Sequence, residues 1–237
     1  MSHPERGPDT ALRRMCGGLV VSCQAPPGSP LRSPSIMVAM ARAAEAGGAS
    51  GIRANGPADV AAILDSVRLP VLGLNKVDYP DSPVYITPTI ADIDSLLETG
   101  CRLIALDATD RPRPGETTLR DLVEHIHAAG ALAFGDIASQ SDIDGALEAG
   151  VDAIGTTLSG YTGATLPPAE PDLALVRDLV ARATIPVYAE GRYRTVEQVA
   201  AATDLGASFV VVGGAITDPV ALTRSLAAPF VTGSHSG

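Results

Sequence analysis

Val71-Leu-Gly-Leu-Asn-Lys-Val-Asp78 is the stretch of this chain that best indicates its fold. It begins as a short apolar run, of the kind that lies buried on both faces in the middle of a parallel sheet, and this apolar character ends at Lys76. A lysine at the end of a buried strand can act as a base near neutral pH, because burial or neighbouring cations lower its pKa from about 10.4. A solvated strand-end lysine is the alternative interpretation.

The surrounding chain repeats one local pattern: an amphipathic helix, a glycine and a short apolar strand. A glycine just past a helix supplies the left-handed conformation that ends the helix at little cost, so each instance marks a helix ending and a strand beginning. The expected helix starts include Ser33 with Pro34, Pro57, and Thr195 with Gln198 as a capping box. The glycines of the pattern are Gly48, Gly100, Gly130, Gly150 and Gly206.

Eight strands follow from this pattern, with Val84–Ile86 assigned to an extended loop after the third strand. Eight parallel strands alternating with helices predict an α/β fold of one domain, a closed (β/α)₈ TIM barrel. An open doubly wound sheet is the alternative, but no Gly-x-Gly-x-x-Gly follows the first strand to support a dinucleotide site. The predicted strands cover residues 18–23, 50–53, 70–75, 102–107, 131–135, 152–156, 185–189 and 209–213.

Composition and charge narrow the possible functions. The 237 residues are 46% hydrophobic and carry a net charge of −10, which suits a large core but not a nucleic-acid groove. Three cysteines, Cys16, Cys23 and Cys101, lack the number and spacing of a disulfide framework or a zinc site, which favours a cytoplasmic protein without a metal. No run approaches the roughly 18 apolar residues of a membrane span. We expect residues 1–15 and 231–237 to be flexible tails around a catalytic domain of residues 16–230.

The chemistry of a (β/α)₈ barrel lies at the carboxyl ends of its strands. In this chain nearly every predicted strand ends in a polar side chain or a glycine, and such a convergence favours a functional Lys76 over a solvated one. In chain order the strand ends are Gln24, Arg53, Lys76, Asp107, Asp136, Thr156 with Thr157, Glu190, and Gly213 with Gly214.

Several long motifs fall at these strand ends. They are Val21-Ser-Cys-Gln-Ala25, Gly47-Gly-Ala-Ser-Gly-Ile-Arg-Ala-Asn55, Ile86-Thr-Pro-Thr89, Ala105-Leu-Asp-Ala-Thr109, Gly155-Thr-Thr-Leu-Ser-Gly-Tyr-Thr162 and Ala189-Glu-Gly-Arg192. With these motifs the chain resembles the N-acetylmannosamine-6-phosphate 2-epimerase family from about Gly18 to Phe230. The resemblance implies a (β/α)₈ barrel that interconverts the 6-phosphates of N-acetylmannosamine and N-acetylglucosamine in bacterial sialic-acid and amino-sugar catabolism. It also implies a homodimer that needs no cofactor.

The same resemblance implies roles for five strand-end residues. Lys76 is the acid/base at C2 of the sugar, and Glu190 is its partner. Arg53 binds substrate oxygens and, as a cation in the same cleft, lowers the pKa of Lys76. Asp136 orients Arg53 or a sugar hydroxyl, and Gln24 bonds the sugar or its N-acetyl group. A strand-end salt bridge or a polar plug in the upper barrel layer remains the alternative for these side chains.

The substrate phosphate is expected at the loops after strands seven and eight, against backbone N–H groups. Gly191, Gly213 and Gly214 give the backbone close approach there, and Arg192 adds a charged fork. Tight turns with no ligand are the alternative reason for these glycines.

One departure from the family pattern falls in this phosphate region. The family commonly reads Gly-Ser-Ala-Ile-Thr-Arg-Pro after the last strand, whereas this chain reads Gly213-Gly-Ala-Ile-Thr-Asp-Pro219. Asp218 therefore replaces a phosphate-facing arginine and is expected to cap the helix that Pro219 begins. Either Arg192 and the backbone suffice for the phosphate, or the substrate lacks it or carries another group. Two further hypotheses stay open: Schiff-base chemistry at Lys76, and a non-catalytic sugar-binding barrel.

Overall fold

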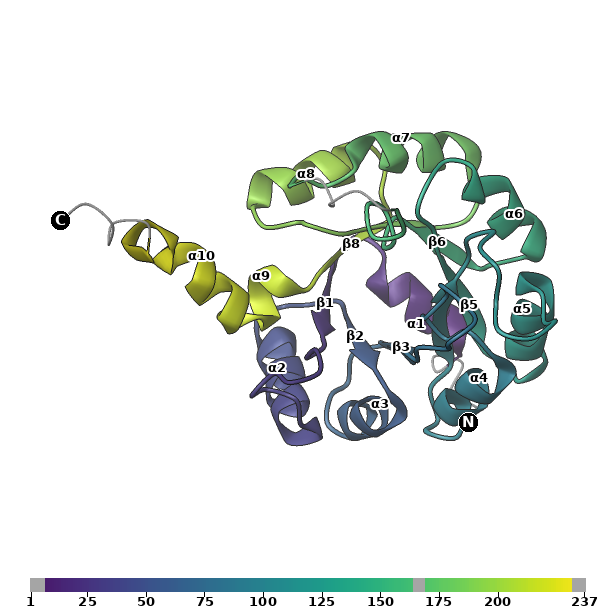
Figure 1. Cartoon of the computed structure of the whole chain (residues 1–237), viewed down its shortest axis with the longest axis horizontal. Helices are drawn as coiled ribbons and strands as arrows, with labels where there is room; N and C mark the ends of the chain where they lie inside the picture. The colour runs from purple at the N-terminus through teal and green to yellow at the C-terminus, as the bar shows by residue number, and fades with distance from the viewer. Residues whose placement is uncertain (1–6, 164–168, 232–237) are drawn as a thin grey trace, which may run out of the picture.

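Eight parallel strands close into one barrel in the computed structural model, which describes residues 7–163 and 169–231 (Figure 1). Each strand pairs with its neighbours in chain order, and β8 pairs with β1. The closed single-domain barrel is thereby confirmed and the open sheet is excluded. The strands are β1 (Leu19–Cys23), β2 (Gly51–Asn55), β3 (Val71–Leu74), β4 (Leu103–Asp107), β5 (Leu132–Asp136), β6 (Ala153–Gly155), β7 (Val187–Glu190) and β8 (Phe209–Val212).

Seven helices surround the barrel in the part of the chain that is described (Figure 1). The predicted glycines all have positive φ, between 68° and 101°, and so end their helices as expected. Ser33 Oγ accepts from the N–H of Ile36, and Thr195 forms its capping box with Gln198. The helices are α2 (Pro34–Ala46), α3 (Pro57–Leu64), α4 (Ile90–Leu97), α5 (Leu119–Ala128), α6 (Asp142–Ala149), α7 (Leu173–Arg182) and α8 (Val196–Asp204).

A short segment before β1 forms helix α1 (Pro8–Met15), so the prediction of a flexible tail over residues 1–15 is wrong for this part. Leu12 and Met15 are buried against the side chains that fill the barrel interior, and α1 lies within the ring of strands in Figure 1. A Cβ on Gly51 would come within 2.7 Å of the Met15 side chain, so the barrel wall leaves room for this helix. Two apolar residues give too weak a pattern to reveal such a contact.

The barrel interior is packed beneath the strand ends by aromatic side chains. Tyr188 stacks on Phe209 with ring centroids 5.3 Å apart, and the ring centroid of Phe134 lies 6.1 Å from that of Tyr188. The Tyr188 ring occupies the space beside Gly155, where any Cβ would meet the ring at 2.1 Å. Glycine at position 155 is therefore required by the position of Tyr188, whose hydroxyl reaches the polar layer at Asp136.

Two helices follow β8, the short α9 (Gly214–Thr217), whose buried Thr217 donates to Ser22 O of β1, and α10 (Pro219–Val231). Figure 1 shows α10 extending away from the ring of helices rather than packing back on it. Its Leu226 is 76% exposed and its Phe230 is 83% exposed. The remaining predicted tail residues, 1–6 and 232–237, lie outside the described residues. Within the described ranges, no helix combines the length and apolar character needed to cross a membrane.

Candidate active site

A cavity of about 860 Å³ opens at the carboxyl ends of the strands. Of the nine residues predicted to react or to bind substrate, all except Asp136 line it, and Asp136 lies directly beneath, fully buried. The cavity is bounded on one side by the loop after β3 and on the other by the segments after β7 and β8. The predicted residues on its wall are Gln24, Arg53, Lys76, Glu190, Gly191, Arg192, Gly213 and Gly214.

Arg53 is the centre of the charged layer at the cavity floor. It is 1% exposed, and its guanidinium forms a two-pronged pair with Asp136 at 3.1 and 2.6 Å. Arg53 Nη1 also lies 3.1 Å from Glu190 Oε2. Burial opposes the charge on Arg53, but Asp136 and Glu190 outweigh it and raise the pKa of the guanidinium. β2, β5 and β7 thus place a permanent cation between two carboxyl groups.

Lys76 and Glu190 both have pKa values displaced toward neutrality. Burial and then the nearby Arg53 lower the pKa of the Lys76 amine below its ordinary 10.5. Burial and then Asp136 raise the pKa of the Glu190 carboxyl above its ordinary 4.5, although Arg53 opposes this shift. The backbone N–H of Lys76 is anchored on Asn55 Oδ1 at 2.8 Å. Two titrating groups with such shifts in one cleft are typical of acid–base catalysis.

Two residues outside the predicted site complete the polar layer. Thr157 Oγ1 lies 2.5 Å from Asp136 Oδ1 and 3.0 Å from Glu190 Oε2. The Tyr188 hydroxyl donates to Asp136 Oδ1 at 2.7 Å. Thr157 was visible in the sequence as a strand-end residue of the Gly155–Thr162 motif, whereas Tyr188 reads as one apolar residue within a buried strand.

Gln24 lines the cavity and has an acceptor without a hydrogen-bond partner among the described residues. Its Nε2 donates to Ser22 Oγ at 2.8 Å, which fixes the orientation of the amide. Gln24 Oε1 and Arg53 Nε are buried and have no hydrogen-bond partner among the described residues. Because buried polar atoms are normally paired, one free acceptor and one free donor on the cavity wall point to a polar ligand that satisfies them.

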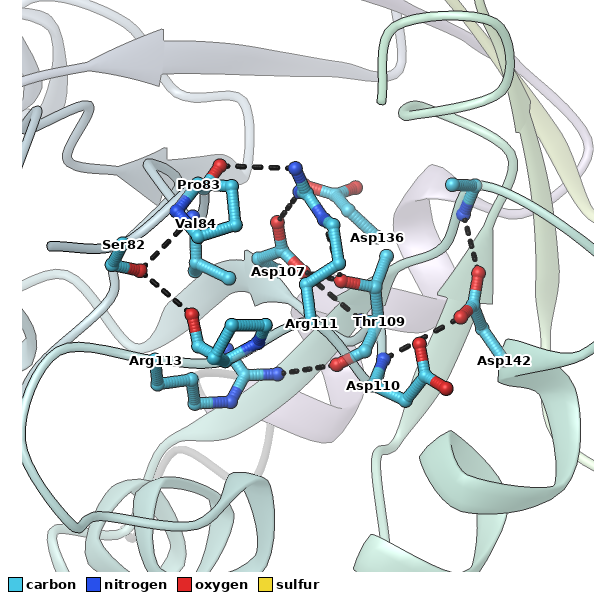
Figure 2. Close-up of polar contacts among 12 residues, drawn as sticks. Ser82, Pro83, Val84, Asp107, Thr109, Asp110, Arg111, Arg113, Asp136 and Asp142 are labelled. Atoms are coloured by element: carbon cyan, nitrogen blue, oxygen red, sulfur yellow. Dashed lines mark hydrogen bonds and ion pairs between the residues drawn. The ribbon is translucent and has the colours of Figure 1, made fainter. Parts of the chain in front are cut away.

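The loop after β3 folds over the cavity edge and is tied down from β4 (Figure 2). Lys76 pairs with Ile86 in an isolated antiparallel bridge, so Val84–Ile86 is a loop segment outside the barrel sheet, as predicted. Arg111 forms an ion pair with the fully buried Asp107 and donates to Pro83 O at 2.9 Å. Asp107 therefore holds this loop rather than facing the cavity.

The far rim, after β7 and β8, is less firmly paired. Arg192 has φ of 65°, donates to Glu170 O at 2.7 Å and to Ser159 O at 2.6 Å, and lies 5.5 Å from the centroid of the Tyr161 ring. Only its second terminal nitrogen is left without a partner among the described residues. Asp218 caps α10 by accepting from the N–H of Ala221 at 2.9 Å, as predicted.

The rim and floor offer no metal site in the part of the chain that is described, because no group of three His, Cys, Asp or Glu side chains is placed to hold an ion. The cavity instead gathers guanidinium, amine, amide and carboxyl groups above an apolar interior. Such a set can bind a polar anionic ligand and move a proton on it.

The chain is similar to known proteins over almost its whole length. Residues 37–230 match the family NanE, described as "Putative N-acetylmannosamine-6-phosphate epimerase". Curated relatives given the corresponding 2-epimerase name include one from Enterobacter sp. (strain 638), 48% identical over 92% of this chain and 95% of its own length. Another, from Clostridium perfringens (strain SM101 / Type A), is 47% identical over 88% of this chain and 94% of its own length.

A solved structure has the same fold. The N-acetylmannosamine-6-phosphate 2-epimerase from Clostridium perfringens matches with a TM-score of 0.91 and 43% sequence identity, over 97% of this chain and 98% of that chain. By contrast, a structure described as native KDPGal, at 20% identity and a TM-score of 0.59, shares the fold alone.

Proposed function

The chain belongs to the N-acetylmannosamine-6-phosphate 2-epimerase family, and we propose that it moves the C2 proton of its substrate with Lys76 and Glu190. It is a carbohydrate isomerase that acts on N-acetylmannosamine 6-phosphate. The observation that supports the proposed roles is that the Lys76 amine, whose pKa is lowered, and the largely buried Glu190 carboxyl, whose pKa is raised, line the same cavity. A cytoplasmic role in sialic-acid and amino-sugar catabolism belongs to the same proposal and is supported by the family.

The reaction requires a proton to leave C2 on one face and to return on the other. In the open-chain sugar, C2 lies next to the C1 aldehyde, so removal of its proton leaves an enolate with charge on O1. Neutral Lys76 takes the C2 proton and becomes ammonium, and protonated Glu190 gives a proton to the opposite face of C2 and becomes carboxylate. The reverse reaction starts from the ammonium and the carboxylate, and the pair is reset by proton exchange.

Binding groups surround this proton transfer. Arg53 Nε is a buried unpartnered donor, suited to the charge that develops on O1. Gln24 Oε1 is the corresponding acceptor, suited to the N–H of the N-acetyl group. Asp136 is committed to Arg53, Thr157 and Tyr188, so it orients Arg53 rather than contacting the sugar.

The phosphate is placed at the β7 and β8 rim in this proposal. Gly191, Gly213 and Gly214 line the cavity there and let the backbone approach an anion closely. Arg192 contributes one free terminal nitrogen, and Arg194 and Arg224 line the same part of the cavity. These groups offset the negative charge of Asp218, which lies on the same wall.

Proton NMR in D₂O tests the proton transfer directly. With N-acetylmannosamine 6-phosphate and wild-type protein, we expect conversion to the gluco epimer with deuterium entering at C2. Lys76→Ala is expected to slow both processes by about 10²–10⁴-fold, and Glu190→Gln to slow the conversion by a similar factor while Lys76 still exchanges the C2 proton on its own face. Full activity in Lys76→Ala would contradict the role of Lys76, and borohydride trapping of a lysine–sugar adduct would indicate Schiff-base chemistry instead.

We also infer that the protein is a homodimer formed through α10. This helix follows β8 but extends from the barrel, whereas in a (β/α)₈ barrel the helix after each strand normally covers the outside of the sheet. Leu222, Leu226 and Phe230 are exposed on it, and Val196 of the neighbouring α8 is 80% exposed. A second copy that brings its own α10 to each barrel would cover both apolar surfaces.

Sedimentation equilibrium at micromolar concentration tests this assembly. We expect a dimer for the wild type and a folded monomer for the double variant Leu226→Asp, Phe230→Asp, because the charges disfavour burial of α10 against a partner. Glu124→Ala on the exposed surface of α5, away from α8 and α10, is a control that should leave the dimer intact. A wild-type monomer would contradict the inference.

A further inference from the structure

Thr157 carries one hydroxyl proton and faces two carboxyl groups. Its Oγ1 lies 2.5 Å from Asp136 Oδ1 and 3.0 Å from Glu190 Oε2. A hydroxyl has a single O–H donor and two acceptor lone pairs, so it can donate to only one of these oxygens at a time. With its proton on the nearer Asp136, Thr157 presents a lone pair to Glu190, and a protonated Glu190 can donate to it.

Asp136 does not depend on Thr157 for its partners. Arg53 contacts both of its oxygens, and the buried Tyr188 hydroxyl donates to Oδ1 at 2.7 Å. Glu190 is less well supplied, since its side chain has only the Arg53 ion pair and the Thr157 contact among the described residues. Transfer of the Thr157 donor from Asp136 to Glu190 therefore costs Asp136 little and gives Glu190 a charge-assisted hydrogen bond.

We propose that Thr157 is a positioning residue for catalysis, whose hydroxyl turns its proton from Asp136 to Glu190 when Glu190 releases a proton to the substrate. In the acid form, Glu190 donates to Thr157 and Thr157 donates to Asp136. In the carboxylate form, Thr157 donates to Glu190 Oε2. No bond to carbon is made or broken by Thr157, and no proton is gained or lost by it. This role rests on the proposed function of Glu190 as the C2 acid.

Among the described residues, four charged or titratable groups act on Glu190. They come from four other sites in the barrel: Arg53 on β2, Lys76 after β3, Asp136 on β5 and Tyr188 on β7. Arg53 remains charged and Tyr188 is fully buried, so neither gains or loses a proton near neutral pH when Glu190 changes its protonation. Lys76 is engaged with the C2 proton in the same step, so rotation of the Thr157 hydroxyl is the adjustment that responds to Glu190 alone.

The pH profile of kcat distinguishes this role from a structural one. Activity requires one proton on the Lys76–Glu190 pair, so the acid limb reports Glu190 and the alkaline limb reports Lys76. Thr157→Val removes the hydroxyl at similar size, and we expect the acid limb to move to higher pH by about one unit because the carboxylate loses a donor. We also expect kcat to fall about tenfold with KM nearly unchanged. Thr157→Ser should keep the wild-type limb.

Tyr188→Phe is the matched control, because it removes a donor to Asp136 that does not reach Glu190. Its acid limb should move less than that of Thr157→Val, because Arg53 still binds both oxygens of Asp136, even if its rate falls. Circular dichroism checks the fold of each variant. If Thr157→Val does not fold, Thr157→Ala replaces it as the variant without a hydroxyl. The proposal is overturned if the acid limb of kcat is unchanged in the hydroxyl-free variant, or if it shifts as far in Thr157→Ser as in that variant.

Glu190→Gln separates this inference from the proposed function on which it rests. If Glu190→Gln keeps the wild-type rate and profile, the role of Glu190 as the acid fails. If Glu190→Gln loses activity while Thr157→Val keeps the wild-type limb, only the role of Thr157 fails.

Discussion

The floor and the rim of the cavity are built in opposite ways. At the floor, Arg53, Asp136 and Glu190 are buried and bound to one another, with Tyr188 and Thr157 completing the layer. At the rim, the segment from Gly213 into α10 is largely exposed, and its one carboxylate, Asp218, caps a helix.

This difference indicates how the chain divides its functions. Buried charges keep their geometry only when each is paired, so the floor is suited to proton transfer with fixed distances. Substitution of exposed rim residues costs little stability, because solvent screens their charges and few contacts depend on them. The rim is therefore where the recognition of phosphate and the contact with a second copy can differ between chains without loss of the chemistry.

Asp136→Ala should give the largest loss of stability. It leaves Arg53, 1% exposed, without its two-pronged partner, and breaking a buried pair in this way costs about 3–5 kcal/mol. Urea unfolding followed by circular dichroism measures the change, and the C2 exchange rate should fall as well. A loss below about 1 kcal/mol would mean that the floor is not the rigid part of the cavity.

Arg111→Ala tests the contacts that hold the loop after β3, which are neither as buried as the floor nor as exposed as the rim. It removes the ion pair to buried Asp107 and the bond to Pro83 O (Figure 2), so we expect a loss of about 2–3 kcal/mol and a higher KM. Arg182→Ala removes an exposed pair with Asp144 and should cost less than about 1 kcal/mol. Equal losses of unfolding free energy in Arg111→Ala and Arg182→Ala would show that Arg111 does not hold the loop after β3.

The pH dependence of wild-type activity tests the titrating groups of the cavity without any substitution. Since burial raises the pKa of Glu190 above 4.5 and lowers that of Lys76 below 10.5, both limbs should lie inside this interval. Activity falls below the acid limb as the pair gains a second proton, and above the alkaline limb as it loses its last. Each pH unit beyond a limb should cost about tenfold in rate. Limbs at or outside 4.5 and 10.5 would contradict the proposed roles of Lys76 and Glu190.

Asp218→Ala should give the smallest effect. It removes an N-cap, which costs about 1 kcal/mol of stability. It also removes a negative charge from the rim, so the KM for the 6-phosphate should fall by a few-fold while kcat stays constant. Steady-state kinetics with the phosphorylated and the free sugar measure this change. A rise in KM for the phosphorylated sugar alone would show that Asp218 helps to hold the substrate.

The sequence was sufficient to predict the barrel fold, because each of its repeated units carries local signals. A helix ended by glycine and followed by an apolar strand is specified within about ten residues, as Gly150 before β6 illustrates. The strand ends, and therefore Arg53, Lys76 and Glu190, follow from that pattern. α1 was missed because its stability comes from Met15 packing against the barrel interior, which no local pattern encodes.

The sequence by itself thus determined the fold and the chemical groups that face the cavity, since strand order and the carboxyl-end rule depend on local periodicity. Only the tertiary structure decided which of these groups are paired. Tyr188 reads as part of an apolar strand, yet closure of the barrel brings its hydroxyl to Asp136, 52 positions away. The same closure sets Thr157 between two carboxyl groups from β5 and β7 and leaves α10 outside. Contacts between strands far apart in the chain depend on the closed geometry, which local propensity does not specify.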